Sequence, residues 1–383
     1  MNIKENIKIS ELTTFRTGGN ARFFCEVLDD NEILEAINFA KEKSIKFLFL
    51  GNGSNLVFSD NDFDGLIIKI STKGIQKEFD DYDFSIVSAS AGEKFDDLID
   101  FALKNNLYGI ENLWNIPGTV GASVVQNIGA YGVEVKDFLF SVDVIDINTS
   151  KKISLKNTKC EFGYRESVFK KNKTSCVFDK DQTHNTMAVF SEKEWSTDHR
   201  EHSACLHTHN IQTPLSDKNL VIVKVYFKLN KKFNPNIGYL GLKDRFVDQK
   251  EILPESIKNI IENIRREKIP DWRVLGTAGS FFKNPILTIK KYEKIKQEYP
   301  EIPFFPFLKG RVKIPLGYVL DKICNLKGFK INNVGFYEKQ ALIVVNYGNT
   351  KAEDILSLIK LAEEKVFEKI GIKIEREVEL VGF

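Results

Sequence analysis

The sequence predicts an α+β protein with mixed sheets, and three observations favour this class. Helical segments and short strands alternate along the chain, but they lack the regular strand–helix–strand repeat of a Rossmann dinucleotide-binding domain. The chain has 383 residues, which is long for one hydrophobic core and fits two or three domains. Hydrophobic residues make up 42% of it and charged residues 28%, as in an ordinary soluble globular protein.

The first part of the chain contains both helical and strand patterns. Apolar residues at helical spacing predict a helix over 31–43, with Asn31 as its N-cap. Segment 46–58, KFLFLGNGSNLVF, predicts two strands joined by a glycine turn. Further along, the predicted elements are strands LIIKI (66–70) and FSIVSASAG (84–92), then a helix FDDLIDFALKNN (95–106).

The second part of the chain continues the alternation. The predicted elements are strands at 141–147, 220–229 and 374–381, helices at 251–268, 316–325 and 352–370, and a turn at 276–285 leading into a strand or helix. Pro270 is expected to end the first of these helices, because proline lacks the N–H group that a helix interior needs.

Composition excludes several function classes. The net charge is +2, which argues against nucleic acid or an anionic membrane as the main partner. The N-terminal residues lack the apolar run of a signal peptide, and no window approaches 18 apolar residues. The five cysteines are odd in number and irregularly spaced, unlike a disulfide framework. We therefore expect a cytoplasmic protein that binds neither membrane nor nucleic acid.

Two glycine-containing segments are candidates for ligand binding. The first, GNGSN, comprises Gly51, Asn52, Gly53, Ser54 and Asn55. Its glycines allow backbone N–H groups to approach a phosphate closely. An ordinary tight turn explains the pattern equally well. IPGTVGASVVQNIGAYG (116–132) has four glycines with small residues between them. That pattern suits backbone pressed against a flat or phosphorylated ligand, and a glycine-rich packing corner is the alternative.

Three other segments carry chemically useful side chains. Tyr164 and Arg165 are adjacent in FGYRES, and a guanidinium can hold a carboxylate by two parallel hydrogen bonds, with an ordinary surface arginine as the alternative. Ser280 follows small residues in GTAGSFFKNP, where a hydroxyl is better suited to giving a proton than to attacking a carbonyl. On the C-terminal strand, Glu375, Glu377 and Glu379 share one face by period two, a pattern that is usually a solvated edge.

These segments, in their order, resemble the family of UDP-N-acetylenolpyruvoylglucosamine reductases, the MurB family. The similar pieces are TTFRTGG (13–19), LGNGSNLVF (50–58), GIENLWNIPGTVGASVVQNIGAYGVEV (109–135), CEFGYRESVFK (160–170), GTAGSFFKNP (276–285) and IEREVELVG (374–382). Segment 320–346 resembles the form of the family with an extra substrate-domain region. Most of the chain is covered, except residues 171–218.

The resemblance implies a two-part FAD-binding unit of the vanillyl-alcohol-oxidase (PCMH) type plus an α+β substrate-binding domain. The implied boundaries are 1–70 for the first FAD-binding subdomain, joined by the C-terminal strand, 71–235 for the second, and 236–383 for the substrate-binding domain and C-terminal segment. A monomer is expected.

The resemblance also implies site residues. The catalytic positions are Arg165, Ser280 and Glu377. The positions that hold noncovalent FAD are Gly51, Asn52, Gly53, Ser54, Asn55, Pro117, Gly118, Thr119, Gly121, Ala122, Asn127, Gly129, Ala130 and Tyr131. The positions that contact a UDP-sugar substrate are Tyr164, Tyr239, Arg265, Lys268 and Asn284.

The implied reaction uses NADPH as co-substrate. Hydride passes from NADPH to the flavin and then to the methylene carbon of an enolpyruvyl group, while Arg165 and Glu377 stabilise the developing negative charge. Ser280 delivers a proton to the neighbouring carbon. No histidine precedes His184, so a histidyl link to FAD from the FAD-binding segments is impossible.

Residues 171–218 are expected to form an atypical insertion. All five histidines of the chain lie there, with Cys176 and Cys205. These residue types bind zinc, but no standard finger spacing is present, so no metal site is predicted. Two other functions stay open: another FAD oxidoreductase of the same fold, and a noncatalytic flavin- or nucleotide-binding protein.

Overall fold

The computed structural model describes residues 1–171, 175–176, 220–239, 241–246 and 251–383. Within these residues the α+β prediction is confirmed, because helices cover sheets that contain both parallel and antiparallel strands. The histidines and most of the predicted insertion 171–218 lie outside the described residues, so the hypothesis of a His/Cys metal site lies outside them as well.

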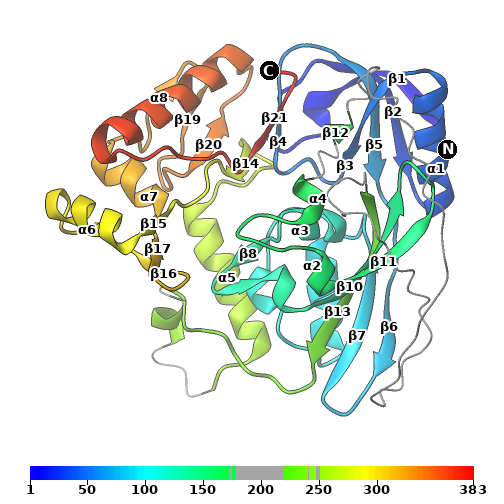
Figure 1. Cartoon of the computed structure of the whole chain (residues 1–383), viewed down its shortest axis with the longest axis horizontal. Helices are drawn as coiled ribbons and strands as arrows, with labels where there is room; N and C mark the ends of the chain where they lie inside the picture. Colours follow the sequence, from blue (N-terminus) through cyan, green and yellow to red (C-terminus); the bar gives the residue numbers. More distant parts are fainter. Residues whose placement is uncertain (172–174, 177–219, 240, 247–250) are drawn as a thin grey trace, which may run out of the picture.

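The first sheet lies at the N-terminal end of the chain (Figure 1). Its strand order is β1 (Ile3–Lys8), β2 (Asn20–Val27), β5 (Phe63–Ile70), β3 (Lys46–Leu50) and β12 (Ser175–Cys176), with β5 parallel to both of its neighbours. Helix α1 (Asp30–Glu42) packs on this sheet through Ile33, Ala36, Ile37 and Ala40. That spacing places all four apolar side chains on one helix face.

The N-cap of α1 differs from the predicted residue. Asp29, not Asn31, accepts hydrogen bonds from the N–H groups of Asn31 (2.8 Å) and Glu32 (2.9 Å). Asp and Asn are similarly good caps, and Asp29 is the residue with extended backbone angles, as an N-cap requires.

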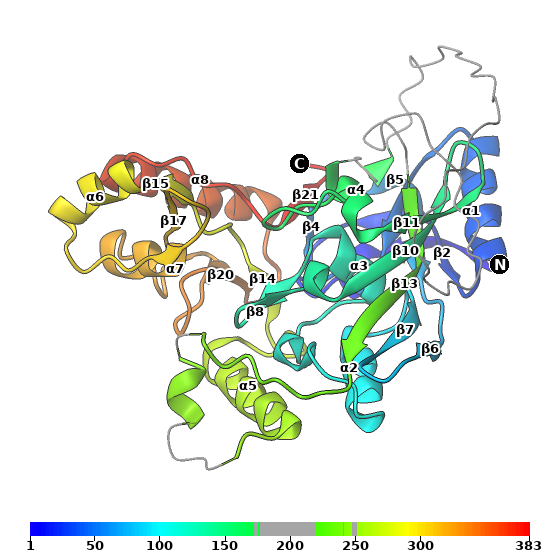
Figure 2. The ribbon, with the colours of Figure 1, turned by 60° about the horizontal axis from the view of Figure 1, so that its bottom comes forward.

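The second sheet is antiparallel throughout. Its order is β11 (Lys152–Lys156), β10 (Leu139–Asp146), β13 (Leu220–Asn230), β7 (Phe84–Ser90) and β6 (Ile75–Asp80). Helices α2 (Phe95–Lys104) and α3 (Val120–Val125) pack on it and share its core, which includes Val87, Leu98, Val124 and Phe227. A small hairpin, β8 (Gly129–Ala130) with β9 (Val133–Glu134), and the short helix α4 (Val168–Lys171) lie beside α3 (Figures 1 and 2).

The third part of the protein has two smaller antiparallel sheets. One has the order β14 (Gly276–Ser280), β20 (Ile343–Asn346), β19 (Val334–Phe336) and β18 (Lys330–Ile331); the other has β15 (Ile286–Thr288), β17 (Arg311–Lys313) and β16 (Phe305–Pro306). Its helical elements are α5 (Pro254–Lys268), α6 (Ile289–Glu298), α7 (Leu316–Tyr318), a π-helical turn (Val319–Ile323) and α8 (Ala352–Ile370).

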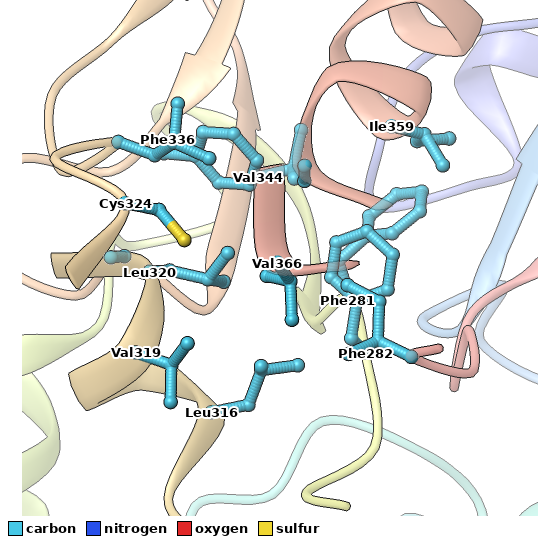
Figure 3. Close-up of a cluster of buried hydrophobic side chains, with 14 of the residues drawn as sticks. Phe281, Phe282, Leu316, Val319, Leu320, Cys324, Phe336, Val344, Ile359 and Val366 are labelled. Atoms are coloured by element: carbon cyan, nitrogen blue, oxygen red, sulfur yellow. The ribbon is translucent and has the colours of Figure 1, made fainter. Parts of the chain in front are cut away.

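A large apolar core holds this third part together (Figure 3). Phe281, Phe282 and Phe336 are fully buried, and Leu316, Leu320 and Val366 pack among them. A fully buried phenylalanine stabilises the fold by about 1.5–3 kcal/mol. Phe281 and Phe282 directly follow Ser280, so their burial fixes the position of the serine.

The C-terminal tail returns to the first part of the chain. Strand β21 (Glu379–Val381) pairs in parallel with β4 (Leu56–Phe58), which follows the GNGSN turn (Figure 1). The predicted strand 374–381 is therefore too long: residues before Glu379 are not in a regular strand, because β4 offers only three residues to pair with. Instead, the N–H of Glu377 donates to the carbonyl of Phe281 at 2.9 Å.

Candidate active site

Residues from all three parts of the protein line one cavity of about 2180 Å³. Its walls include the GNGSN turn, the glycine-rich segment after Asn115, the end of α5, strand β14 and the C-terminal tail. Small-molecule pockets are typically about 300–1,000 Å³. This cavity therefore has room for a large cofactor and a second ligand.

The GNGSN turn forms one wall of the cavity. Gly53 has φ +60°, and a Cβ there would lie 2.5 Å from the carbonyl oxygen of Leu12, so only glycine fits. In the described part of the chain, the backbone N–H groups of residues 52–55 donate to no other group. Free N–H groups at a glycine turn suit a pyrophosphate oxygen. The arrangement therefore fits FAD, which carries a pyrophosphate between its two halves.

The second glycine-rich segment faces the first. The hydroxyl of Ser54 donates to the carbonyl of Pro117 at 2.8 Å, which joins the two segments. Thr119 caps helix α3 by accepting from the N–H of Ala122 at 3.3 Å. Most of the predicted FAD residues line the cavity: Gly51, Asn52, Gly53, Ser54, Asn55, Pro117, Gly118, Thr119, Gly121, Ala122, Gly129, Ala130 and Tyr131.

Asn127 is the predicted FAD residue that the structure places elsewhere. Its side chain is fully buried and does not line the cavity. The sequence pattern could not reveal this, because the glycine-rich segment indicates a backbone close to a ligand but not the direction of each side chain.

Arg165 lies at the tip of a tight turn. Gly163 and Glu166 exchange two backbone hydrogen bonds, and Arg165 between them has φ +58°, an uncommon conformation for a residue with a Cβ. Its guanidinium donates to Glu377 Oε1 (2.9 Å), the carbonyl of Gly129 (2.7 Å) and the carbonyl of Asn127 (3.4 Å). These bonds engage three of its five N–H groups and leave two for a ligand.

Glu377 reaches Arg165 from the C-terminal tail. The side-chain amide of Asn55 donates to the carbonyl of Glu377 at 3.1 Å, so the GNGSN turn holds the tail in place. The side chains of Arg165 and Glu377 are 19% and 13% exposed, and both border the cavity. The pair therefore presents a guanidinium and a carboxyl to whatever ligand binds there.

Ser280 is exposed on the cavity wall at the end of β14. The register of β14 and β20 shifts between Thr277 and Ser280, and Gly279 has φ +77°. This irregularity places the serine beside the cavity while the next residue, Phe281, enters the core. All three predicted catalytic residues thus border the same cavity.

The predicted substrate residues divide into two groups. Tyr239, Arg265 and Lys268 line the cavity. Tyr164 and Asn284 do not; the N–H of Asn284 donates to the hydroxyl of Tyr164 at 3.4 Å, and Asn284 Oδ1 accepts from the N–H of Leu316 at 2.8 Å. Tyr164 and Asn284 are therefore joined to each other outside the residues that line the cavity.

Tyr239 connects two parts of the site through its ring. It stacks on Phe305 with centroids 5.9 Å apart and meets the ring of Tyr131 edge-on at 5.6 Å. Such aromatic pairs stabilise by about 0.5–1.5 kcal/mol beyond their buried area. The phenol is therefore held over the cavity between the FAD-binding segment and the third part of the protein.

The structure also places residues at the cavity that sequence analysis missed. Trp272, Arg273, Gln340 and Asp96 line it. Burial raises the pKa of Asp96 to about 6, although its bond to the Asn115 N–H (2.8 Å) and the nearby Arg265 oppose the rise. No signal in the sequence distinguished Asp96 from Asp97, its neighbour on the same helix.

Comparisons with known proteins agree with this architecture. An FAD binding domain model matches residues 21–154, and the C-terminal domain model of UDP-N-acetylenolpyruvoylglucosamine reductase matches residues 271–381. The reductase of Flavobacterium johnsoniae is 34% identical over 381 residues and covers 100% of both chains; that of Neisseria gonorrhoeae is 32% identical, covering 98% of this chain and 96% of its own.

A solved structure shows the same fold. The MurB reductase of Thermus caldophilus superposes with a TM-score of 0.60 at 19% identity, covering 100% of this chain and 99% of its own. The predicted fold class, a two-part FAD-binding unit with an α+β domain, is confirmed. A protein with this FAD-binding unit and an α+β domain beside the cavity belongs to the class of FAD-dependent oxidoreductases. Similarity to the curated relatives over the full length narrows the class. The chain belongs to the UDP-N-acetylenolpyruvoylglucosamine reductase, or MurB, family.

Proposed function

We propose that this protein uses NADPH and noncovalent FAD to reduce UDP-N-acetylglucosamine enolpyruvate to UDP-N-acetylmuramate, a step in peptidoglycan precursor synthesis. The observation that carries the proposal is that Arg165, Ser280 and Glu377, from three distant segments, border one cavity with the FAD-binding glycine segments. FAD held by these segments would supply the chemistry of hydride transfer between NADPH and the methylene carbon of the enolpyruvyl group.

Arg165 and Glu377 would act on the substrate carboxylate. Hydride addition at the methylene carbon moves negative charge toward that carboxylate. The two free N–H groups of Arg165 can donate a bidentate pair of hydrogen bonds to its oxygens. Glu377 keeps the guanidinium in place through the 2.9 Å contact to Nε. Prepositioned donors of this kind need no rearrangement during the reaction.

Ser280 would supply the proton that completes the reduction. Ser280 is exposed on the wall of the cavity, and the adjacent Phe281 is fully buried in the core. The O–H bond breaks as a new C–H bond forms on the carbon next to the methylene group, and solvent returns a proton to the serine. A positioned proton donor typically accelerates its step about 10²–10⁴-fold.

The UDP part of the substrate would lie near the end of α5. Arg265 and Lys268 supply positive charge there, and Tyr239 supplies a hydroxyl above the cavity. Tyr164 and Asn284 remain proposed substrate contacts, and the bond between the Asn284 N–H and the Tyr164 hydroxyl keeps the two residues together.

The positions of two buried cysteines support noncovalent binding of FAD. Cys25 and Cys160 are fully buried and do not line the cavity. Burial raises the pKa of each thiol to about 12, so neither forms a thiolate near neutral pH. Neither residue is therefore suited to a covalent link.

The boundaries 1–70, 71–235 and 236–383 remain our proposal for the domains, and we propose a cytoplasmic monomer. Residues 1–70 supply four strands of the first large sheet, and residues 71–235 supply its edge strand β12 and all of the second large sheet. The two smaller sheets with β14 and β15 lie within 236–383. No described helix is long and apolar enough to traverse a lipid bilayer.

The visible spectrum of the purified protein, followed by NADPH oxidation assays, tests the proposal. We expect flavin absorbance that is released on denaturation, and NADPH consumption that depends on the enolpyruvyl sugar nucleotide. Bound flavin without that dependence would favour another FAD oxidoreductase of the same fold. Absence of turnover with every acceptor would favour a noncatalytic binding protein.

A further inference from the structure

The hydrogen bonds of Asn127 point to a role that differs from cofactor binding. Its amide donates to the carbonyl of Gly163 and to Glu134 Oε2, both at 3.0 Å, and its Oδ1 accepts from the N–H of Lys136 at 3.0 Å. Both amide hydrogens are therefore used inside the protein. A flipped amide would place its oxygen against two acceptors, so the network fixes its orientation.

The carbonyl of Gly163 belongs to the turn that carries Arg165. That carbonyl accepts from both Glu166 N (3.2 Å) and the Asn127 amide, and the turn holds Arg165 at φ +58°. A conformation that a Cβ disfavours persists only where surrounding contacts hold it. The Asn127 amide is one such contact, and it comes from outside the turn.

Asn127 also contacts the guanidinium directly. Its backbone carbonyl accepts from Arg165 Nη1 at 3.4 Å, and the carbonyl of Gly129, two residues later, accepts from Nη2 at 2.7 Å. The same residue thus holds the backbone of the arginine turn through its side chain and the head of the arginine through its carbonyl.

We infer that Asn127 is a positioning residue that sets Arg165 for the substrate carboxylate, and that it makes no contact with FAD. The inference rests on the proposed role of Arg165 and deepens it. A misplacement of about 1 Å can slow a reaction about 10²-fold. Loss of the Asn127 amide should therefore slow only the half-reaction that uses Arg165.

Asn127→Asp tests this inference, because it keeps the size of the side chain and removes its donors. In stopped-flow experiments we expect the reoxidation of reduced flavin by the enolpyruvyl sugar nucleotide to slow by on the order of 10²-fold. Flavin reduction by NADPH and the Kd of FAD should stay within about twofold, as expected for a change worth under ~0.5 kcal/mol. Adding Arg165→Ala should abolish the effect of Asn127→Asp, since the asparagine acts through the arginine.

Asn346→Asp is the matched control. Asn346 is also a buried amide that donates to backbone carbonyls, those of Phe15 (2.9 Å) and Arg16 (3.3 Å), and it is not among the hydrogen-bond partners of Arg165. Its substitution should lower Tm without changing the ratio of the two half-reaction rates. If Asn127→Asp does not retain FAD at saturating concentrations, Asn127→Ser, which adds no charge beside Glu134, replaces it.

Two outcomes would overturn the inference. One is equal slowing of both half-reactions, which would indicate a general structural role. The other is a weaker FAD Kd with unchanged rates at saturation, which would make Asn127 a cofactor ligand. The Arg165→Ala variant distinguishes these two outcomes from failure of the proposed function. If substrate reoxidises the reduced flavin of that variant at the wild-type rate, the proposed role of Arg165 itself is wrong.

Discussion

Arg165 and Glu377 are 212 residues apart in the chain, and their side chains meet at 2.9 Å between Nε and Oε1. The contact joins the turn after the second FAD-binding segment to the C-terminal tail. Because Asn55 and Phe281 fix the backbone of Glu377, the pair also links the GNGSN turn and the strand that carries Ser280. One connected set of hydrogen bonds therefore runs from Arg165 through Glu377 to Phe281, the residue that follows Ser280.

Glu377→Gln should slow flavin reoxidation by substrate on the order of 10²-fold, because the neutral side chain no longer holds the guanidinium by charge. Glu375→Gln is the control: this residue is two positions earlier, its side chain is 76% exposed and it lies outside the cavity wall. Stopped-flow absorbance with pre-reduced enzyme measures both variants. Equal rates for the two would show that the Arg165 contact has no catalytic value.

Gly53→Ala should weaken FAD binding and destabilise the protein. The added Cβ would meet the Leu12 carbonyl at 2.5 Å in a residue that is already at φ +60°. Gly371→Ala provides the comparison, since Gly371 has φ +63° but nothing within 4 Å of an added Cβ. We expect about 1–2 kcal/mol of destabilisation for the positive φ alone and a larger loss at Gly53. Tm values measure the destabilisation of both variants, and FAD titrations measure the loss of FAD affinity. An equal fall in Tm for Gly53→Ala and Gly371→Ala would contradict the close-packing argument.

Asp96 should make stability depend on pH. Burial raises its pKa in the folded protein to about 6, from 3.8. The folded state therefore binds the proton more tightly than the unfolded state, and the associated stability is present below pH 3.8 and lost as pH rises through about 6. The charged groups that face Asp96 are Arg265, Lys258 and Asp100.

Asp96→Asn removes this titration while keeping an acceptor for the Asn115 N–H. We expect the Tm of the variant minus that of the wild-type protein to increase as pH rises from 3.8 to about 6, the unfolded and folded pKa of Asp96. A difference that does not change with pH would show that Asp96 is not the group responsible. Asp97→Asn, on the exposed side of the same helix, is the matched control variant.

Regular elements of the fold could be predicted where a single face of a helix or strand is buried. Helix α8 was predicted over 352–370 and spans Ala352–Ile370, because its apolar residues follow the helical period over five turns. The C-terminal strand was predicted too long, because alternation alone cannot show that β4 is only three residues long.

The site itself depends on contacts that sequence spacing does not encode. The resemblance identified Arg165, Ser280 and Glu377, but neither their meeting at one cavity nor the bonds of Asn127 follow from distances along the chain. Asn127 illustrates the limit, since its neighbours Gly129 and Ala130 line the cavity while its own side chain turns inward.

Single-turnover kinetics of Ser280→Ala test the central claim most directly. The variant is reduced anaerobically by NADPH and then mixed with the enolpyruvyl sugar nucleotide while flavin absorbance is followed. We predict reduction at the wild-type rate and reoxidation slowed by about 10²–10⁴-fold, because only the second half-reaction needs the serine proton. Wild-type reoxidation, or equal slowing of both half-reactions, would contradict the assignment of Ser280 as proton donor beside the flavin.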